Sequence, residues 1–172
     1  MKRYTSKHDR PPLASGGTGV GTPKPPSPPL RRGAWTKERF LTVLSRNVEP
    51  HVLDVVQDLC NWTETRADRV WMGRGAEQGS FTFHYLKEGL AISVFTLYAD
   101  GRFVLNYRRF YRRVTRETLQ AFHQRITAIP SFSHIPAEFS SLHTLRIADA
   151  FRDPEDIRKF KQAVEWLRDQ LK

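Results

Sequence analysis

Cysteine is nearly absent from this chain of 172 residues. Cys60 is the single cysteine, so no intrachain disulfide can form and a small secreted scaffold held by disulfides is excluded. One thiol also cannot supply a cysteine zinc cluster, which needs several thiolates at short spacing. Because Cys60 lies beside the apolar positions of a predicted helix, we interpret it as a core residue rather than a nucleophile.

Long hydrophobic runs are also missing. No apolar stretch approaches the roughly 20 residues that cross a bilayer. The basic start Met1-Lys2-Arg3 is not followed by the apolar segment of a secretory signal. We therefore expect a soluble, cytoplasmic protein without a membrane partner. Hydrophobic residues still make up 39% of the chain and aromatic residues 12%, which is enough for a packed core.

The motifs of several enzyme classes are absent as well. The six histidines form no HExxH or other close metal pair, and there is no Gly-x-Ser-x-Gly motif. No Asp or Glu is followed two positions later by Lys, the arrangement with which restriction-type nucleases hold Mg²⁺ and activate water. His123, His134 and His143 are separated in the sequence, so only the fold can bring them together. The sequence predicts no catalytic residue, no metal site and no cofactor.

The composition changes sharply near Trp35. Residues 1–34 hold seven of the 11 prolines and five of the 10 glycines, with almost no large aliphatic side chains. Such a segment cannot bury enough apolar surface to offset an ordering cost of roughly 1–2 kcal/mol per residue. We predict a disordered, basic Pro/Gly-rich tail over residues 1–34, followed by one domain over residues 35–172.

Two motifs in the tail resemble binding sequences. The string Gly16–Thr22 has the glycine spacing of a phosphate-binding loop but lacks its lysine and its flanking strand and helix, so we interpret it as a linker. Pro26-x-x-Pro29-x-Arg31 matches the pattern of polyproline II ligands. A protein partner that binds the tail is therefore an open alternative.

The positive charge is concentrated in two segments. The tail carries seven basic and one acidic side chains, a net charge of +6, so residues 35–172 contribute +4 of the total of +10. Residues 102–116 hold six arginines and no acid. The rest of the domain then has 15 basic and 17 acidic side chains, a net charge of −2. Affinity for a polyanion is expected in residues 102–116 and in the tail.

The hydrophobic period predicts an α+β fold. Helices are expected to begin after Thr36 and at Pro50, and the period changes from 3.6 to 2 at Val70. Strands are predicted over residues 70–72, 81–86, 90–98 and 102–107, with the third central because both of its faces are largely apolar. Asp100-Gly101 predicts a type I′ hairpin turn, with positive φ at both residues.

Two further helices are predicted after this hairpin. They begin after Thr115 and at Asp153-Pro154, and a short extended segment over residues 142–147 lies between them. The whole pattern is that of an antiparallel three- to four-stranded meander with helices packed on one face.

The strongest functional motif is Arg108-Arg109-Phe110-Tyr111-Arg112-Arg113. Guanidinium groups pair with phosphates, while interleaved aromatic rings can stack on bases. The sequence therefore predicts a nucleic-acid-binding site made of Arg108, Arg109, Arg112 and Arg113, assisted by Arg31 and Arg32 of the tail. The alternative is that this segment is an edge strand that leads into a helix. Its charges then suppress aggregation, and Phe110 and Tyr111 lie in the core.

One set of glycines and aromatics resembles a known family. It comprises Trp71-Met72-Gly73-Arg74-Gly75, Gly79-Ser80-Phe81, residues 95–101, Arg125-Ile126, Ile129-Pro130 and Trp166. Over residues 36–171 the chain resembles a domain of uncharacterised prokaryotic proteins, often found C-terminal to nuclease-like or restriction and phage-defence regions. The resemblance implies an accessory domain, and it transfers no catalytic residue to this chain.

Our hypothesis from the sequence is a non-enzymatic nucleic-acid-binding or accessory domain whose partner is DNA or RNA. One alternative is a small nuclease or hydrolase in which Asp54, Asp58 and Glu77 converge through the fold. The other is a protein-interaction module that uses the Pro-rich tail. Clustered carboxylates beside residues 73–79 would indicate the enzyme, whereas a continuous arginine face would indicate binding.

Overall fold

The computed structural model describes residues 35–75 and 78–172. The predicted tail, with its glycine string, its polyproline motif and the candidate residues Arg31 and Arg32, lies outside the described residues. The same holds for Glu77. Within the described ranges, no helix is long and apolar enough to cross a membrane.

The described elements follow one another in the order α1 (Lys37–Leu44), α2 (Pro50–Arg66), β1 (Arg69–Met72), β2 (Ser80–Lys87), β3 (Leu90–Tyr98), β4 (Arg102–Leu105), α3 (Tyr107–Phe110), α4 (Arg116–Thr127), a 3-10 turn η1 (Pro130–Phe132), β5 (His143–Arg146), α5 (Ile147–Ala150) and α6 (Pro154–Asp169). The predicted helix starts are confirmed. Thr36, Thr115 and Asp153 each accept a hydrogen bond from a backbone N–H of the first helical turn, and Pro50 is the first residue of α2.

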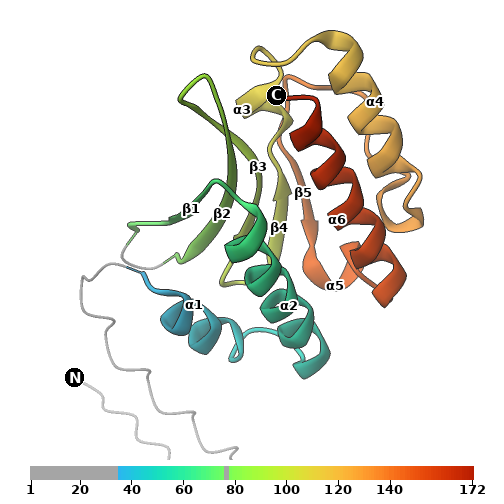
Figure 1. Ribbon diagram of the computed structural model, residues 1–172. Coiled ribbons are helices and arrows are strands. Elements are labelled where there is room, and N and C mark those ends of the chain that lie inside the picture. The colour runs from blue at the N-terminus through green and yellow to red at the C-terminus, as the bar shows by residue number, and fades with distance from the viewer. Residues whose placement is uncertain (1–34, 76–77) are drawn as a thin grey trace, which may run out of the picture.

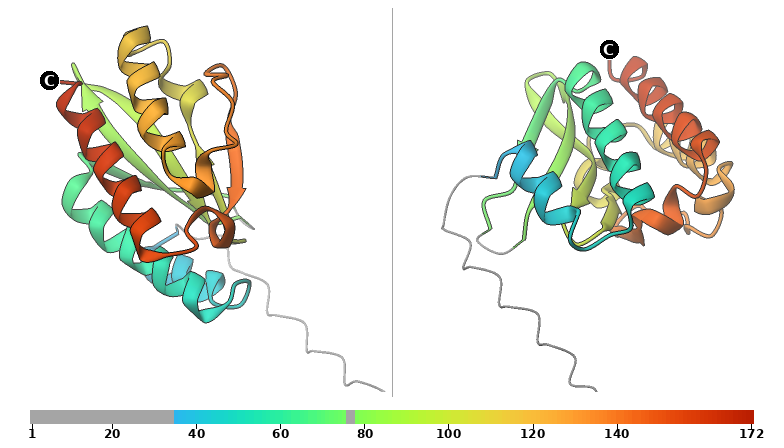
Figure 2. Two further views of the ribbon diagram at one scale, coloured as in Figure 1. Left: turned by 90° about the vertical axis from the view of Figure 1, so that its right-hand side faces the viewer. Right: turned by 90° about the horizontal axis from the view of Figure 1, so that it is seen from below.

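All five strands form one antiparallel sheet in the order β1-β2-β3-β4-β5 (Figure 1). Helices α1, α2 and α6 pack on one face, and α4 lies beside α6 (Figures 1 and 2). The α+β class, the helices on one face and the central position of β3 are therefore confirmed. No described helix covers the opposite face, which we call the open face.

Aromatic rings join the helices to the sheet. Phe103 of β4 lies at the centre of a cluster, with ring centroids 5.4–5.8 Å from those of Phe95, Phe132, Phe151 and Phe160. Trp62 of α2 stacks on Phe83 of β2 at 5.3 Å. Edge-to-face and offset contacts of this kind add to the hydrophobic gain from burying the rings.

The meander has one strand more than the three to four predicted. The segment expected to be extended over residues 142–147 supplies β5, which pairs with β4. Only Leu145 in β5 is buried, so its sequence shows little alternation. The strand predicted to reach Tyr107 ends at Leu105, because α3 begins at Tyr107; the backbone N–H of Asn106 still donates to the carbonyl of Val94, in register with the pairing of β3 and β4.

The hairpin at Asp100-Gly101 is confirmed, but its predicted turn type is wrong. Among the residues of that loop only Gly101 has positive φ, at 86°. Three residues separate β3 from β4, and glycine in the left-handed region closes such a three-residue loop. The pair with positive φ at both positions is Glu88-Gly89, between β2 and β3, at 52° and 76°.

Candidate nucleic-acid interface

The open face is polar, whereas the face under the helices is apolar. Strand register and side-chain alternation assign its residues. They are Arg69 and Trp71 of β1, Ser80, Thr82, His84 and Leu86 of β2, Ala91, Ser93, Thr96 and Tyr98 of β3, Arg102 and Val104 of β4, and Thr144 and Arg146 of β5. None of these strand residues is acidic.

A hollow of about 320 Å³ lies on the open face. It is lined by Trp71, Gly73, Ser80, Thr82, His84, Ser93, Thr96, Tyr98 and, from α3, Arg109. Its lining comes from β1 and the residue after it, β2, β3 and α3, so it exists only when these three strands are paired and α3 is in place.

Hydroxyl and amide groups form the floor of this hollow. The hydroxyls of Thr82 and Thr96 are 3.1 Å apart across β2 and β3. The Nδ2 of Asn106, a buried side chain, donates to the hydroxyls of Ser93 and Thr96, each at 2.9 Å. This network holds the polar groups in place, and hydroxyl groups can both donate and accept hydrogen bonds.

A β-bulge brings Ser93 to the open face. Phe83 pairs with Phe95, but the next residue, His84, pairs with Ser93, so Val94 is an extra residue in β3. Strict alternation predicts that Ser93 shares a face with Phe95, and the bulge reverses that assignment for the first half of β3. The sequence shows no glycine at this point that would have indicated the bulge.

Five arginines lie on or beside the open face, of which Arg109 lines the hollow and Arg146 lines a separate hollow with Glu49 and Asp100. Arg69, Arg102 and Arg146 belong to strands, Arg74 follows β1, and Arg109 reaches in from α3. Arg102 pairs with Asp100 at 2.8 Å. Within the described ranges no ion pair joins the other four to a carboxylate, so their charge is not neutralised by these residues.

Two aromatic side chains accompany these arginines. Trp71 is 43% exposed, and the guanidinium carbons of Arg69 and Arg74 lie 5.2 and 5.8 Å from the centre of its ring. Tyr98 carries the guanidinium of Arg102 over its ring at 4.6 Å. The indole N–H of Trp35 donates to the carbonyl of Gly75 at 2.7 Å and so anchors the segment that follows Trp71.

His84 is the titratable group at the centre of the open face. Burial, reinforced by the charges of Arg69 and Arg109, lowers the pKa of His84 below its usual value of 6.5, although backbone hydrogen bonds oppose this. Its Nδ1 is buried and has no hydrogen-bond partner in the part of the chain that the structure describes. Near neutral pH the ring is therefore uncharged.

We expect acid to destabilise the domain through His84. The pKa of this histidine returns to about 6.5 on unfolding, so below that pH the unfolded state binds more protons and the free energy of unfolding falls. His84→Gln should reduce the difference in melting temperature between about pH 7.5 and about pH 5.5, whereas His51→Gln on the exposed surface of α2 should not. An unchanged difference in His84→Gln would contradict this assignment.

The structure places the four arginines predicted from the sequence in different surroundings. Arg108 and Arg109 are exposed on α3, and only Arg109 lines the open-face hollow. Arg112 donates to the hydroxyl of Tyr111 at 2.8 Å, and Arg113 donates to the carbonyl of Ala91. The sequence missed Arg69 and Arg74, which are only five positions apart, and Arg146, which shares a face with them only through the pairing of the five strands.

The binding hypothesis needs exposed aromatic rings in that motif, and Phe110 is not exposed. Phe110 is fully buried and packs against Tyr107 and Phe122, so it cannot stack on a base. This part matches the alternative in which Phe110 lies in the core, although the segment is a short helix and not an edge strand. The exposed ring near the arginines is Trp71, which sequence analysis noted only as part of a resemblance.

Of the three carboxylates proposed for a nuclease, the two that the structure describes do not lie beside the hollow. Asp54 and Asp58 are exposed on α2, on the helical side of the sheet, and Asp58 pairs with Lys161 at 2.6 Å. Glu77 lies outside the described residues. In the described ranges no group of three or more His, Cys, Asp or Glu side chains could hold a metal ion.

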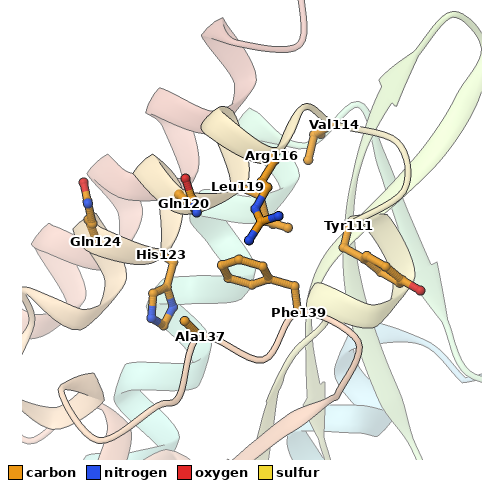
Figure 3. A pocket seen from close by; sticks show the side chains of 9 residues that line it. All are labelled: Tyr111, Val114, Arg116, Leu119, Gln120, His123, Gln124, Ala137 and Phe139. Carbon is orange, nitrogen blue, oxygen red and sulfur yellow. The ribbon is translucent and has the colours of Figure 1, made fainter.

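A second hollow, of about 800 Å³, lies between α4 and the loop that leads to β5 (Figure 3). In Figure 3 the guanidinium of Arg116 points toward the ring of Phe139, and His123 lies beside Ala137. Two of the three histidines considered above approach each other here, since His123 and His143 both contact the ring of Tyr107. His134 is exposed and lies apart. This hollow is larger than that on the open face, and each of the two has one arginine in its lining, Arg116 here and Arg109 there.

Cys60 is fully buried in α2. Burial raises the pKa of its thiol to about 12, so the thiolate needed for nucleophilic attack does not form near neutral pH. The prediction that Cys60 is a core residue is confirmed.

No family model matches the chain, and searches of curated proteins and of solved structures give no match either. The candidate interface is therefore defined by its own geometry and charge.

Proposed function

We propose that this domain binds nucleic acid, with the phosphates contacting the arginines around the open face. The observation that carries the proposal is that Arg69, Arg74, Arg102, Arg109 and Arg146 lie on or beside one uncovered sheet face whose strand residues include no acid. Guanidinium groups pair with phosphates through two parallel hydrogen bonds, and arginine holds its charge at any physiological pH.

The surroundings of the arginines support a nucleic acid over a small anion. The five side chains come from β1, its following segment, β4, β5 and α3, so they span the sheet from one edge to the other. Spacing of that kind suits a ligand with repeated negative charges. The tail adds six net positive charges to the chain, which also favours a polyanionic ligand.

Salt-dependent binding tests this proposal. We expect the full chain to bind an oligonucleotide of about 12 residues at about 50 mM salt and to lose affinity steeply toward about 200 mM, because each phosphate contact releases counterions. Fluorescence anisotropy measures both values. Absence of salt-dependent binding at the low end would show that the proposal is wrong.

Substitutions in α3 and in the turn after it locate the contact. Replacing Arg108, Arg109, Arg112 and Arg113 with Gln should flatten the log–log salt slope by about 0.7–0.9 for each phosphate that no longer pairs with an arginine. Arg109→Gln alone should account for most of this change, because it lines the hollow. Arg112→Gln is the matched control, since it removes the same charge from a side chain bonded to Tyr111. Equal effects of the two single variants would contradict the placement of the interface on the open face.

A further inference from the structure

We infer that the open face selects single-stranded nucleic acid, with unpaired bases stacking on Trp71 and Tyr98. This inference rests on the proposed function and adds the structural class of the ligand. Its evidence lies in the two rings, in the floor between them and in the width of the sheet.

Trp71 has the geometry of a stacking platform. It is one of four large hydrophobic side chains that are exposed within the described residues, and the only aromatic one among them. Arg69 and Arg74 lie close enough to its ring to contact the phosphates next to a base that stacks there. Every base has a π-face, so such a platform accepts any sequence.

Tyr98 offers a second ring on the same hollow. Trp71 pairs across the sheet with Thr82, and Thr82 with Thr96, which precedes Tyr98 by two residues on the same face. The two rings are thus two strands apart, about 10 Å in the direction across the sheet. Arg102 lies over Tyr98 as the other arginines lie beside Trp71. Each ring therefore has a guanidinium over it, which can turn to the backbone when a base stacks on that ring.

The floor between the rings suits base edges. The hydroxyls of Thr82 and Thr96 and the amide of Asn106 are joined by hydrogen bonds of 2.9–3.1 Å. Hydroxyl groups can donate to or accept from the edges of bases that are not paired with a second strand. In a duplex the base faces are stacked on one another and cannot reach either ring.

The width of the sheet disfavours a duplex further. Five strands at the usual spacing of about 4.8 Å measure about 19 Å across, whereas the major groove of B-DNA is about 12 Å wide and admits a helix or a two-stranded ribbon. The open face therefore cannot enter the groove to read base edges. A flexible single strand can instead lie across it.

The test compares single strands with a duplex in the full chain. The probes are a 12-residue oligothymidylate, the corresponding oligouridylate and the dT12–dA12 duplex, with about 12 residues chosen to span one site. We expect both single strands to bind at least about tenfold more tightly than the duplex at the same salt concentration, since one stacked base alone supplies that much. Equal affinity for duplex and single strand would overturn the inference and leave the proposed function standing.

Variants of Trp71 separate stacking from charge. Trp71→Ala should weaken single-strand binding by about fivefold to 150-fold, the range for removal of one stacked base, without changing the salt slope or the duplex affinity. Trp71→Phe should retain most of the affinity. Leu90→Ala, which removes an exposed hydrophobic side chain at the start of β3 that lines neither hollow, is the matched control and should bind as the wild type does. Melting temperatures verify that each variant is folded.

Fluorescence gives a second readout. Oligothymidylate should quench part of the tryptophan emission of the wild type, and Trp71→Phe should bind without that part of the quenching. Binding of single strands with no quenching and no effect of Trp71→Ala would overturn the inference. Concentration-dependent self-association that Trp71→Ala abolishes, without any preference for single strands, would do the same and would identify the open face as a protein interface.

Discussion

Replacing Phe103 with Ala should lower the free energy of unfolding by about 3–5 kcal/mol, the usual cost of truncating a buried phenylalanine. Phe103 has no exposed surface, and its ring contacts those of Phe95, Phe132, Phe151 and Phe160. These partners come from β3, η1, the segment after α5 and α6. The truncation would leave a cavity at the point where the sheet, η1 and α6 meet. Urea denaturation followed by circular dichroism measures the change.

Two matched variants make this result interpretable. Phe103→Leu keeps most of the apolar volume and should cost much less than Phe103→Ala. Leu142→Ala removes an exposed side chain and should change stability by less than about 0.5 kcal/mol. A decrease below about 1 kcal/mol in Phe103→Ala would contradict the packing of the five rings.

Replacing Arg69, Arg102 and Arg146 together with Gln should weaken nucleic-acid binding by roughly one to two orders of magnitude near physiological salt. The three side chains lie on β1, β4 and β5, so the substitution removes charge from both edges of the open face. If each contacts one phosphate, the salt slope should fall by about 2–3 in total. Fluorescence anisotropy with a single-stranded oligonucleotide measures both effects.

The control for this variant carries the same change in net charge. Arg116, Arg152 and Arg158 are exposed and lie in or next to α4 and α6, which are on the helical side. Replacing these three with Gln should leave most of the affinity intact, because exposed charges more than a Debye length away, about 8–10 Å, are screened. If both triple variants lose affinity equally, binding depends on overall charge and the open face is not the site.

The distribution of arginines changes the interpretation of the sequence motif. The six-residue run from Arg108 to Arg113 dominates the sequence because its cations are adjacent in the chain. In the structure it splits, with Arg109 directed to the open face and Phe110 to the core. Residues that are adjacent in the sequence thus have different surroundings in the structure, which the linear motif does not show.

Local patterns in the sequence were enough to predict the elements and the fold class. Caps such as Thr36, Thr115 and Asp153, and Pro50 at a helix start, depend on hydrogen bonds and backbone angles within a few residues. Alternation over β2 and β3 likewise reflects burial of one strand face at a time. Each of these signals depends only on residues close together in the sequence. The α+β meander with helices on one face could therefore be predicted from them.

The open face depended on contacts between residues distant in the chain. The bulge at Val94 arises from the pairing of β2 with β3, and it moves Ser93 across the sheet relative to strict alternation. Arg69 and Arg146 are 77 positions apart and share a face only because β1 and β5 are the two edges of one sheet. The sequence by itself determined the helices, the strands and the excess of arginine in residues 102–116. Only the tertiary structure decided which arginines and aromatic rings meet, because strand register and helix placement set which side chains stay uncovered.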